Sequence, residues 1–104
     1  MLTRKLLFDI NAIGFGKWAE RRLRLLGYQV HFVNSIHWDW YIRLLAKKCG
    51  YIIVTFDSDF SNDENAVVLD MRRNYEENYT YLLKELRRKG WGICALSATL
   101  SPAR

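Results

Sequence analysis

Three aspartates have the residue type and spacing of a metal-binding carboxylate cluster. Asp9 ends the first apolar run of the chain, and Asp57 and Asp59 end the third. Because side chains alternate between the two faces of an extended chain, Asp57 and Asp59 are expected on one face, with Ser58 pointing away. If the two runs form neighbouring parallel strands, the three carboxylates meet at one edge of the sheet. Carboxylates held together raise one another's pKa unless a cation neutralises them, and such hard oxygen ligands suit Mg²⁺ or Mn²⁺.

A fourth acid, Asp39, stands at the start of a predicted helix, 39–48. Helices of a parallel α/β fold begin at the edge of the sheet where the strands end, so Asp39 is a candidate fourth member of the cluster. The simpler alternative is that Asp39 caps its helix, and the two roles are compatible. Asp9 and Asp57 can likewise serve only to shape the turns after their strands. Asp63, in the acidic loop that follows, is a reserve ligand.

Strand and helix patterns alternate along the whole chain. Strands are predicted at 6–9, 28–33, 51–56, 66–69 and 91–96. Three helices are predicted between them, each followed by a glycine: Gly27, Gly50 and Gly90. This alternation predicts an α/β layer fold with a mainly parallel sheet.

The composition fits one small globular domain. Of the 104 residues, 50% are hydrophobic and 26% are charged, which is too apolar for an intrinsically disordered chain. Sixteen Lys and Arg against eleven Asp and Glu give a net charge of +5, which favours polyanionic partners such as nucleic acid. Cys49 and Cys94 lack metal-ligand spacing and are expected to be reduced, packed thiols. Because no apolar run approaches the roughly 18 residues of a membrane span, a cytoplasmic protein with no membrane partner is expected.

Basic residues form two groups that are candidates for contacts with a nucleic acid backbone. Lys17, Arg21 and Arg24 fall on one face of the predicted helix that follows the first strand. Arg72 and Arg73 follow the fourth strand and are therefore expected at the same edge of the sheet as the acids. Contacts of such cations with phosphates are sensitive to salt. A solvated helix face is the alternative interpretation of the first group.

Four segments of the chain resemble the PIN-like ribonucleases, and especially the compact PIN-like proteins that are paired with antitoxins. The most specific segment runs from Thr55 to Phe60 and is similar to the Thr-x-Asp-x-Asp-Phe signature of that family. The other three are Leu6–Asn11 with its Asp-x-Asn ending, the helix and Leu-Gly-Tyr exit between Gly14 and Tyr28, and the pattern Asp39-x-x-Ile42-x-x-x-Ala46. The resemblance covers residues 5–60.

The resemblance implies a three-layer α/β/α fold with a mainly parallel five-stranded sheet in chain order 2-1-3-4-5. It implies a single PIN-like domain over residues 1–96, followed by a C-terminal tail over 97–104. It also implies a homodimer, for which the apolar arc around Arg22 and the tyrosines Tyr75, Tyr79 and Tyr81 offer exposed apolar surface.

The function that the resemblance implies is a divalent-metal-dependent endoribonuclease, in the role of the toxin of a toxin–antitoxin pair. In this sequence the acidic quartet of the family is Asp9, Asp39, Asp57 and Asp59. The metal is held mainly by Asp9 and Asp57, and one or two Mg²⁺ or Mn²⁺ ions activate a water that attacks the scissile phosphate of the RNA in line. Thr55 is implied to hold the strand end or a water, and Asn11 to orient Asp9 or touch the substrate.

The sequence departs from the family at one position of the signature. Many relatives have Arg or Lys between the Thr and the first Asp, whereas this chain has Phe56. A phosphate contact must then come from elsewhere, and Lys17 and Arg21 are candidates.

Two other functions are alternatives. The first is a catalytically inactive PIN-like module that binds nucleic acid or protein and whose acids are structural. The second is a phospho-accepting signalling domain, but the sequence lacks the paired acid before Asp9 and the lysine after a later strand that this class needs.

Overall fold

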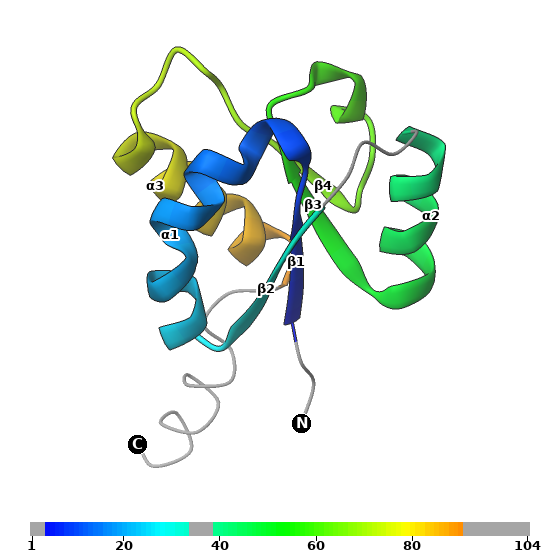
Figure 1. Ribbon diagram of the computed structural model, residues 1–104, viewed down its shortest axis with the longest axis horizontal. Helices are drawn as coiled ribbons and strands as arrows, with labels where there is room; N and C mark the ends of the chain where they lie inside the picture. The colour runs from blue at the N-terminus through cyan, green and yellow to red at the C-terminus, as the bar shows by residue number, and fades with distance from the viewer. Residues whose placement is uncertain (1–3, 34–38, 91–104) are drawn as a thin grey trace.

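Residues 4–33 and 39–90, which the computed structural model describes, form four strands and three α-helices that alternate along the chain (Figure 1). The strands are β1 (Arg4–Phe8), β2 (Tyr28–Phe32), β3 (Tyr51–Thr55) and β4 (Ala66–Val68). The helices are α1 (Ile13–Leu25), α2 (Asp39–Cys49) and α3 (Tyr75–Arg88). Two short 3-10 helices, η1 (Ile10–Ala12) and η2 (Ser58–Phe60), follow β1 and β3.

The strands form one parallel sheet in the order β2-β1-β3-β4. Phe8 of β1 lies beside Phe32 of β2 on one side and Val54 of β3 on the other. The continuous apolar, β-branched sequence of β3 suits a strand that is buried on both faces. The predicted parallel α/β fold is confirmed, and the observed order agrees with the first four strands of the predicted one. The predicted fifth strand, 91–96, and the predicted tail, 97–104, lie outside the described residues.

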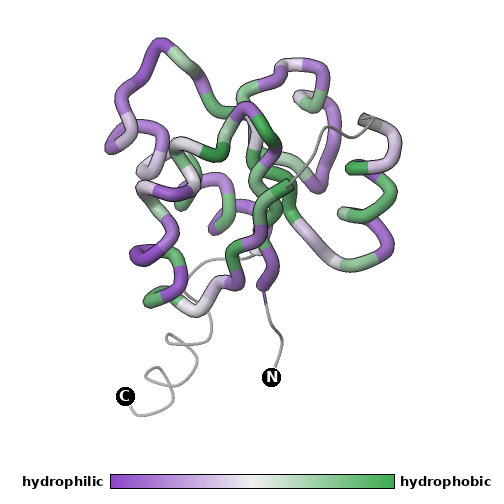
Figure 2. Tube along the Cα trace, viewed as in Figure 1, coloured by the Kyte–Doolittle hydropathy of each residue, from purple (hydrophilic) through white to green (hydrophobic). Residues whose placement is uncertain are grey.

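Helices cover both faces of the sheet (Figure 1). α1 and α3 pack on the face that carries Leu6 and Phe8 of β1, and α2 packs on the face that carries Leu7. These side chains alternate between the faces because a strand has a period of two residues. Figure 2 shows the hydrophobic residues concentrated along the central strands, between the helices. The core therefore lies in two layers, one on each side of the sheet.

The start of α1 lies very close to the sheet because residue 16 is a glycine. A Cβ atom at Gly16 would lie 2.7 Å from a ring atom of Phe32 and 2.8 Å from a ring atom of Phe8. A residue without a side chain is therefore needed at this position. The contact holds the first turns of α1 against β1 and β2, directly beyond the end of β1.

An aromatic cluster joins α1 to α3. The ring centroid of Trp18 lies 5.5 Å from that of Tyr75 and 5.9 Å from that of Tyr79. The guanidinium carbon of Arg22 lies 4.0 Å from the Trp18 ring centroid, and a guanidinium nitrogen lies 3.6 Å from Oε1 of Glu76. Arg22 falls within the apolar arc of α1 because its flat head covers aromatic surface. Part of the surface that was expected to be exposed is thus buried within the chain, although Tyr75 remains 42% exposed.

Two expectations from the composition can be compared with the structure. Cys49, expected to be packed, is exposed, because it is the last residue of α2 and the chain turns away at Gly50, where φ is 77°. Cys94 lies outside the described residues. Among the residues described, no helix is long and apolar enough to cross a membrane.

Candidate active site

β1 and β3 end side by side, which places Asp9 next to the end of β3. Asp9 directly follows β1, and its backbone N–H donates to the carbonyl oxygen of Val54 at 2.9 Å. Asp9 is buried, with 5% of its surface exposed. The prediction that Asp9 lies beside the end of the third strand is confirmed, because β1 and β3 are neighbours in the sheet.

Both oxygens of the Asp9 carboxylate accept hydrogen bonds. Oδ1 accepts from the backbone N–H of Ile10 at 2.8 Å and so caps η1, and Oδ2 accepts from Oγ1 of Thr55 at 2.9 Å. Each oxygen retains a further lone pair. No ion pair joins Asp9 to a Lys or Arg within residues 4–33 and 39–90. Asp9 is therefore a fixed, buried carboxylate with spare acceptor capacity and no cationic partner in that part of the chain.

The hydroxyl group of Thr55 links Asp9 to the loop after β3. Thr55 is completely buried. Its Oγ1 donates to Asp9, has Oδ1 of Asn11 as a second acceptor at 3.3 Å, and accepts from the N–H of Asp57 at 3.0 Å. Oδ1 of Asn11 also accepts from the N–H of Phe56 at 3.0 Å. Thr55 thus holds the two chain segments together, and Asn11 contacts Thr55 and Phe56 rather than Asp9.

Asp57 and Asp59 do not lie on an extended strand, so the expectation that they alternate with Ser58 is wrong. β3 ends at Thr55, and residues 58–60 form η2. The chain turns there because Oδ1 of Asp57 accepts from the N–H of Asp59 at 2.9 Å, which caps η2, and because Phe60 is completely buried. Asp57 is half-buried, whereas Asp59 is exposed.

Of the four predicted acids, the structure describes the side chains of three. α2 begins at Asp39, at the end of the molecule where β1 also ends (Figure 1), but the side chain of Asp39 is not among those described. Among the side chains that are described, no group of three or more His, Cys, Asp and Glu is arranged to hold a metal ion. The structure thus brings Asp9 and the backbone of Asp57 together through Thr55, and it does not show three converging carboxylates.

The reserve ligand Asp63 is bound to a cation of the protein. Its Oδ2 lies 2.6 Å from Nε of Arg43 on α2. The same guanidinium donates to the carbonyl oxygen of Asp59 at 2.8 Å. Arg43 therefore holds the acidic loop against α2, and the Asp63 carboxylate serves that contact.

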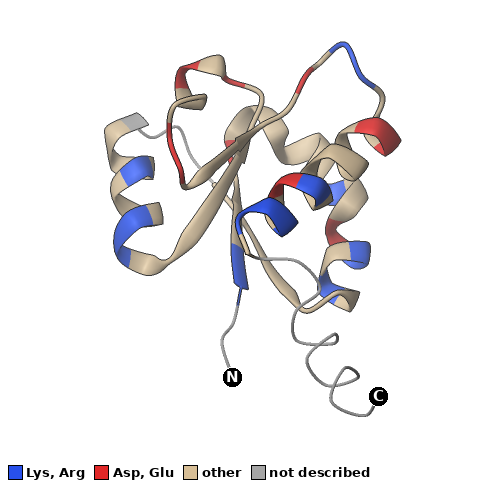
Figure 3. Cartoon of the chain, turned by 180° about the vertical axis from the view of Figure 1, so that it is seen from behind, with Lys and Arg blue, Asp and Glu red and all other residues tan. Residues whose placement is uncertain are grey.

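The basic group on α1 lies on an exposed face. Figure 3 shows most Lys and Arg residues on the helices and several acids in the loops beyond the strand ends. Nζ of Lys17 lies 4.4 Å from the ring centroid of Phe32. Arg24 pairs with Glu20 at 2.8 Å and donates to the carbonyl oxygen of Val30 at 3.1 Å, which fixes it to the protein. Lys17 and the exposed Arg21 are thus the better placed of the three for a ligand.

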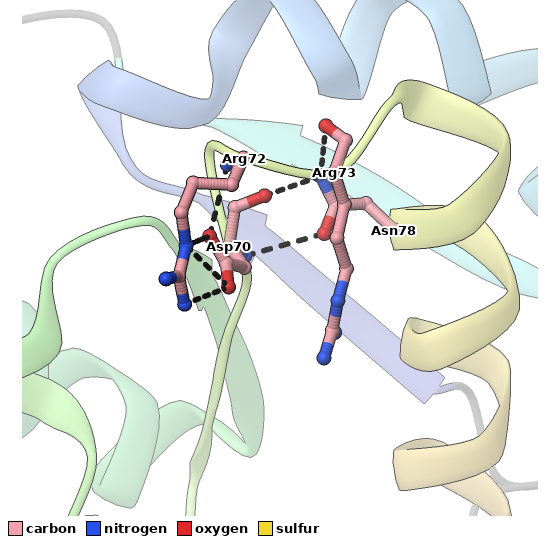
Figure 4. A network of polar contacts seen from close by, with 4 residues as sticks. All are labelled: Asp70, Arg72, Arg73 and Asn78. Carbon is pink, nitrogen blue, oxygen red and sulfur yellow. Dashed lines mark hydrogen bonds and ion pairs between the residues drawn. The ribbon is translucent and has the colours of Figure 1, made fainter.

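Arg72 and Arg73 lie in the loop between β4 and α3 and already have contacts (Figure 4). Arg72 binds both carboxylate oxygens of Asp70, with a shortest distance of 2.8 Å, and these hydrogen bonds lower the pKa of Asp70 from 3.8 to about 2. The buried Asn78 of α3 accepts from the N–H of Asp70 at 3.2 Å and donates to its carbonyl oxygen at 3.0 Å. The guanidinium carbon of Arg73 lies 4.8 Å from the ring centroid of Tyr81. Either arginine must leave its present contact to bind a substrate.

Replacing Asp70 with Asn is expected to make stability less dependent on pH between about 4 and 2. Because its pKa is lowered in the folded protein, Asp70 stabilises the fold above pH 3.8, and this contribution is lost as the pH falls toward 2. Urea midpoints of the wild type and Asp70→Asn should therefore differ at neutral pH and converge in acid. The difference should be small because the Arg72 partner is exposed to solvent. A difference that persists unchanged at the lowest pH would contradict this account.

A small cleft lies beside the Thr55 network and was not predicted from the sequence. It has a volume of about 160 Å³ and is lined by Asn11, Gly14, Phe15, Phe56, Met71, Arg73 and Tyr75. These residues come from separate segments, so no local pattern connects them. The signal that was available is the apolar Met71 within the otherwise polar stretch 70–74. A larger hollow, of about 540 Å³, lies between β4 and the end of α3 and is lined by none of the described catalytic candidates.

Comparison with known proteins returns no match to a family model, to a curated protein or to a solved structure. The resemblance to PIN-like ribonucleases therefore rests on the four sequence segments alone.

Proposed function

We propose that this protein is a divalent-metal-dependent endoribonuclease whose site lies beyond the ends of β1 and β3. The observation that carries the proposal is the buried Asp9 carboxylate, which is fixed by two hydrogen bonds and forms no ion pair with a described Lys or Arg. Buried carboxylates in proteins are paired with cations or coordinate metals. The backbone N–H of Asp57 donates to the same Thr55 hydroxyl group, and the carboxylate of Asp57 is the second proposed ligand.

The donor set fits a hard divalent cation. Asp9 and Asp57 would hold Mg²⁺ or Mn²⁺ through carboxylate oxygens, with Asp39 and Asp59 as further acids. When bound, such an ion supplies an activated water and stabilises charge on the phosphate. The chain's own residues keep the donors in place, because the buried Thr55 hydroxyl contacts both Asp9 and the N–H of Asp57.

RNA is the substrate that suits the charge of the chain. The net charge of +5 favours a polyanion. Lys17 and Arg21 extend along the exposed face of α1, which starts just after Asp9, and would follow the phosphate backbone away from the acids. Arg72 and Arg73 would add phosphate contacts from the loop after β4, once released from Asp70 and Tyr81.

Membership of the PIN-like family is part of the same proposal. It is supported by the four sequence segments and by the strand order β2-β1-β3-β4, which a fifth strand at 91–96 would complete next to β4. The toxin role, an antitoxin partner, a homodimer and a cytoplasmic location follow from the resemblance and the composition, and they stay predictions.

A catalytically inactive binding module is the second candidate. It is favoured by the observation that no three described acids are arranged for a metal ion, and by the capping roles of Asp9 and Asp57. In that case the acids stabilise the turns after the strands, and the basic residues alone bind RNA.

Cleavage of a labelled single-stranded RNA pool in Mn²⁺, Mg²⁺ or chelator separates the two functions. The wild type is expected to cut with metal and not with chelator. Asp57→Asn is expected to cut about ten- to a hundredfold more slowly, because Asn still caps η2 but lacks the charge. Glu64→Gln is the matched control, since it removes one negative charge from an exposed residue of the loop before β4 that has no proposed role in binding metal or RNA, and it should leave the rate unchanged.

Two outcomes would overturn the ribonuclease proposal. One is a wild type that binds RNA without metal and cuts it under no condition. The other is equal, metal-independent cutting by the wild type and Asp57→Asn. The first outcome would establish the binding module in its place.

A further inference from the structure

The cleft beside Asn11 has aromatic walls; we call it the aromatic cleft. Phe15, which is 1% exposed, lies at its base. The rings of Phe56 and Tyr75 both stand edge-on to Phe15, with centroid distances of 6.5 and 5.5 Å and interplanar angles of 83° and 73°. The cleft is thus bounded by two rings from separate segments, one from the loop after β3 and one from the start of α3.

The lining of the aromatic cleft is apolar and carries a positive charge but no negative one. Met71 is 78% exposed and Tyr75 is 42% exposed, so large apolar side chains face solvent here. Arg73 is the one charged residue among those that line it. The volume of about 160 Å³ is close to the roughly 150 Å³ of a cavity that holds a single benzene ring. One planar ring belonging to an anionic molecule fits this size and this charge.

The rim of the aromatic cleft holds a fixed polar group that is available to a ligand. Oδ1 of Asn11 accepts from the N–H of Phe56 and from Thr55, which identifies the oxygen of the amide. Nδ2 of Asn11 makes no hydrogen bond to another described residue, and Asn11 is exposed. The amide therefore has a donor that is available to a ligand. Its oxygen contacts the Thr55 hydroxyl group, which in turn donates to the Asp9 carboxylate.

We propose that the aromatic cleft binds one unstacked nucleobase of the RNA, beside the acids Asp9 and Asp57 that would hold the metal ion. This inference rests on the proposed ribonuclease function. Bases of single-stranded RNA are recognised by stacking on aromatic side chains, with hydrogen bonds to their edges. Phe56 and Tyr75 provide the aromatic surface, and Nδ2 of Asn11 provides a donor for an acceptor on the base edge. Phe56 thereby has a role in base contact at the position where a cation was expected.

Binding of a labelled single-stranded RNA oligonucleotide and of its abasic counterpart, both in chelator so that neither is cut, tests the inference by fluorescence anisotropy. The wild type is expected to bind the RNA with bases roughly tenfold more tightly than the abasic chain. Tyr75→Leu and Met71→Ala should lose most of this preference. Their affinity for the abasic chain should equal that of the wild type, which shows that they are folded and that backbone contacts persist. Trp40→Leu is the matched control, because Trp40 is an aromatic residue with 61% exposure on α2, outside the cleft, and the variant should keep the preference.

The possible failures of the two proposals are distinguishable. A wild type that cuts RNA but binds both oligonucleotides equally would overturn the base site and leave the ribonuclease standing. A preference that survives in Tyr75→Leu and Met71→Ala would also overturn it. A wild type that shows the preference but never cuts would overturn the ribonuclease and support the base site. A wild type that binds neither oligonucleotide in chelator would overturn the base site. If it also cuts no RNA with metal, the ribonuclease is overturned as well, and the cleft is left to an aromatic side chain of a protein partner.

Discussion

Asp9→Asn is expected to slow metal-dependent RNA cleavage by about a hundred- to a thousandfold while the protein stays folded. The substitution keeps the size of the buried side chain and removes its charge. The amide oxygen of Asn still accepts from the N–H of Ile10. The amide nitrogen can donate to Oγ1 of Thr55, whose own proton then turns to Oδ1 of Asn11, 3.3 Å away. The hydrogen bonds of Asp9 therefore have a satisfied alternative in the variant, and the expected loss is that of the proposed metal ligand.

The loss should exceed that of Asp57→Asn because Asp57 is half-buried and its charge is partly screened by water. Single-turnover rates in Mn²⁺, measured beside the thermal midpoint of each protein, give the comparison. A folded Asp9→Asn protein that cuts at the wild-type rate would exclude Asp9 as a metal ligand. A folded variant that loses activity in the predicted order would support it.

Gly16→Ala is expected to lower the stability of the fold by about 2 kcal/mol, or the melting temperature by roughly 10 °C. The new Cβ would lie 2.7 Å from Phe32 and 2.8 Å from Phe8, so at least one ring of the core must shift. Phe8 is completely buried between its neighbours and has no free space to enter. The cost of overpacking exceeds the gain of about 1 kcal/mol from the better helix propensity of Ala.

Gly14→Ala, one half-turn earlier on α1, is the matched control for this prediction. Its Cβ would lie 3.0 Å from the hydroxyl group of Tyr75, which is the far end of a half-exposed side chain that can move. Thermal unfolding should therefore show a midpoint at or above that of the wild type. Equal midpoints for the two alanine variants would mean that α1 does not depend on the close approach at Gly16.

Much of the fold was predictable because strands and helices of this chain differ clearly in hydrophobic period. The apolar run of β3 and the glycine after each helix mark the elements to within a few residues. The aromatic cluster of Trp18 and Arg22 was harder to interpret, because an arginine within an apolar arc contradicts the period unless the flat guanidinium is known to lie on a ring. That contact lies within α1, but the residues of α3 that complete the cluster are more than fifty positions further along the chain.

The candidate site was predictable only where it depends on the direction of the strands. Asp9 meets the end of β3 because neighbouring parallel strands end at one edge. The orientations of Asp57 and Asp59 were not predictable, since β3 ends at Thr55. The next backbone N–H, that of Phe56, donates to the side chain of Asn11 instead of to a neighbouring strand. The aromatic cleft was not predictable either, because it forms between residues that only the tertiary fold brings together.

The hydrogen bond between Thr55 and Asp9 also has a consequence for the order of events during folding. It joins residues 46 positions apart, and the β-pairing that supports it encloses all of α1, β2 and α2. Contacts between residues so distant in sequence form late, because the intervening chain must lose its freedom first. During synthesis the Asp9 carboxylate cannot form its hydrogen bond with Thr55 until the chain beyond Thr55 has left the ribosome. A nascent chain shorter than this has no formed site and is expected to be inactive toward RNA.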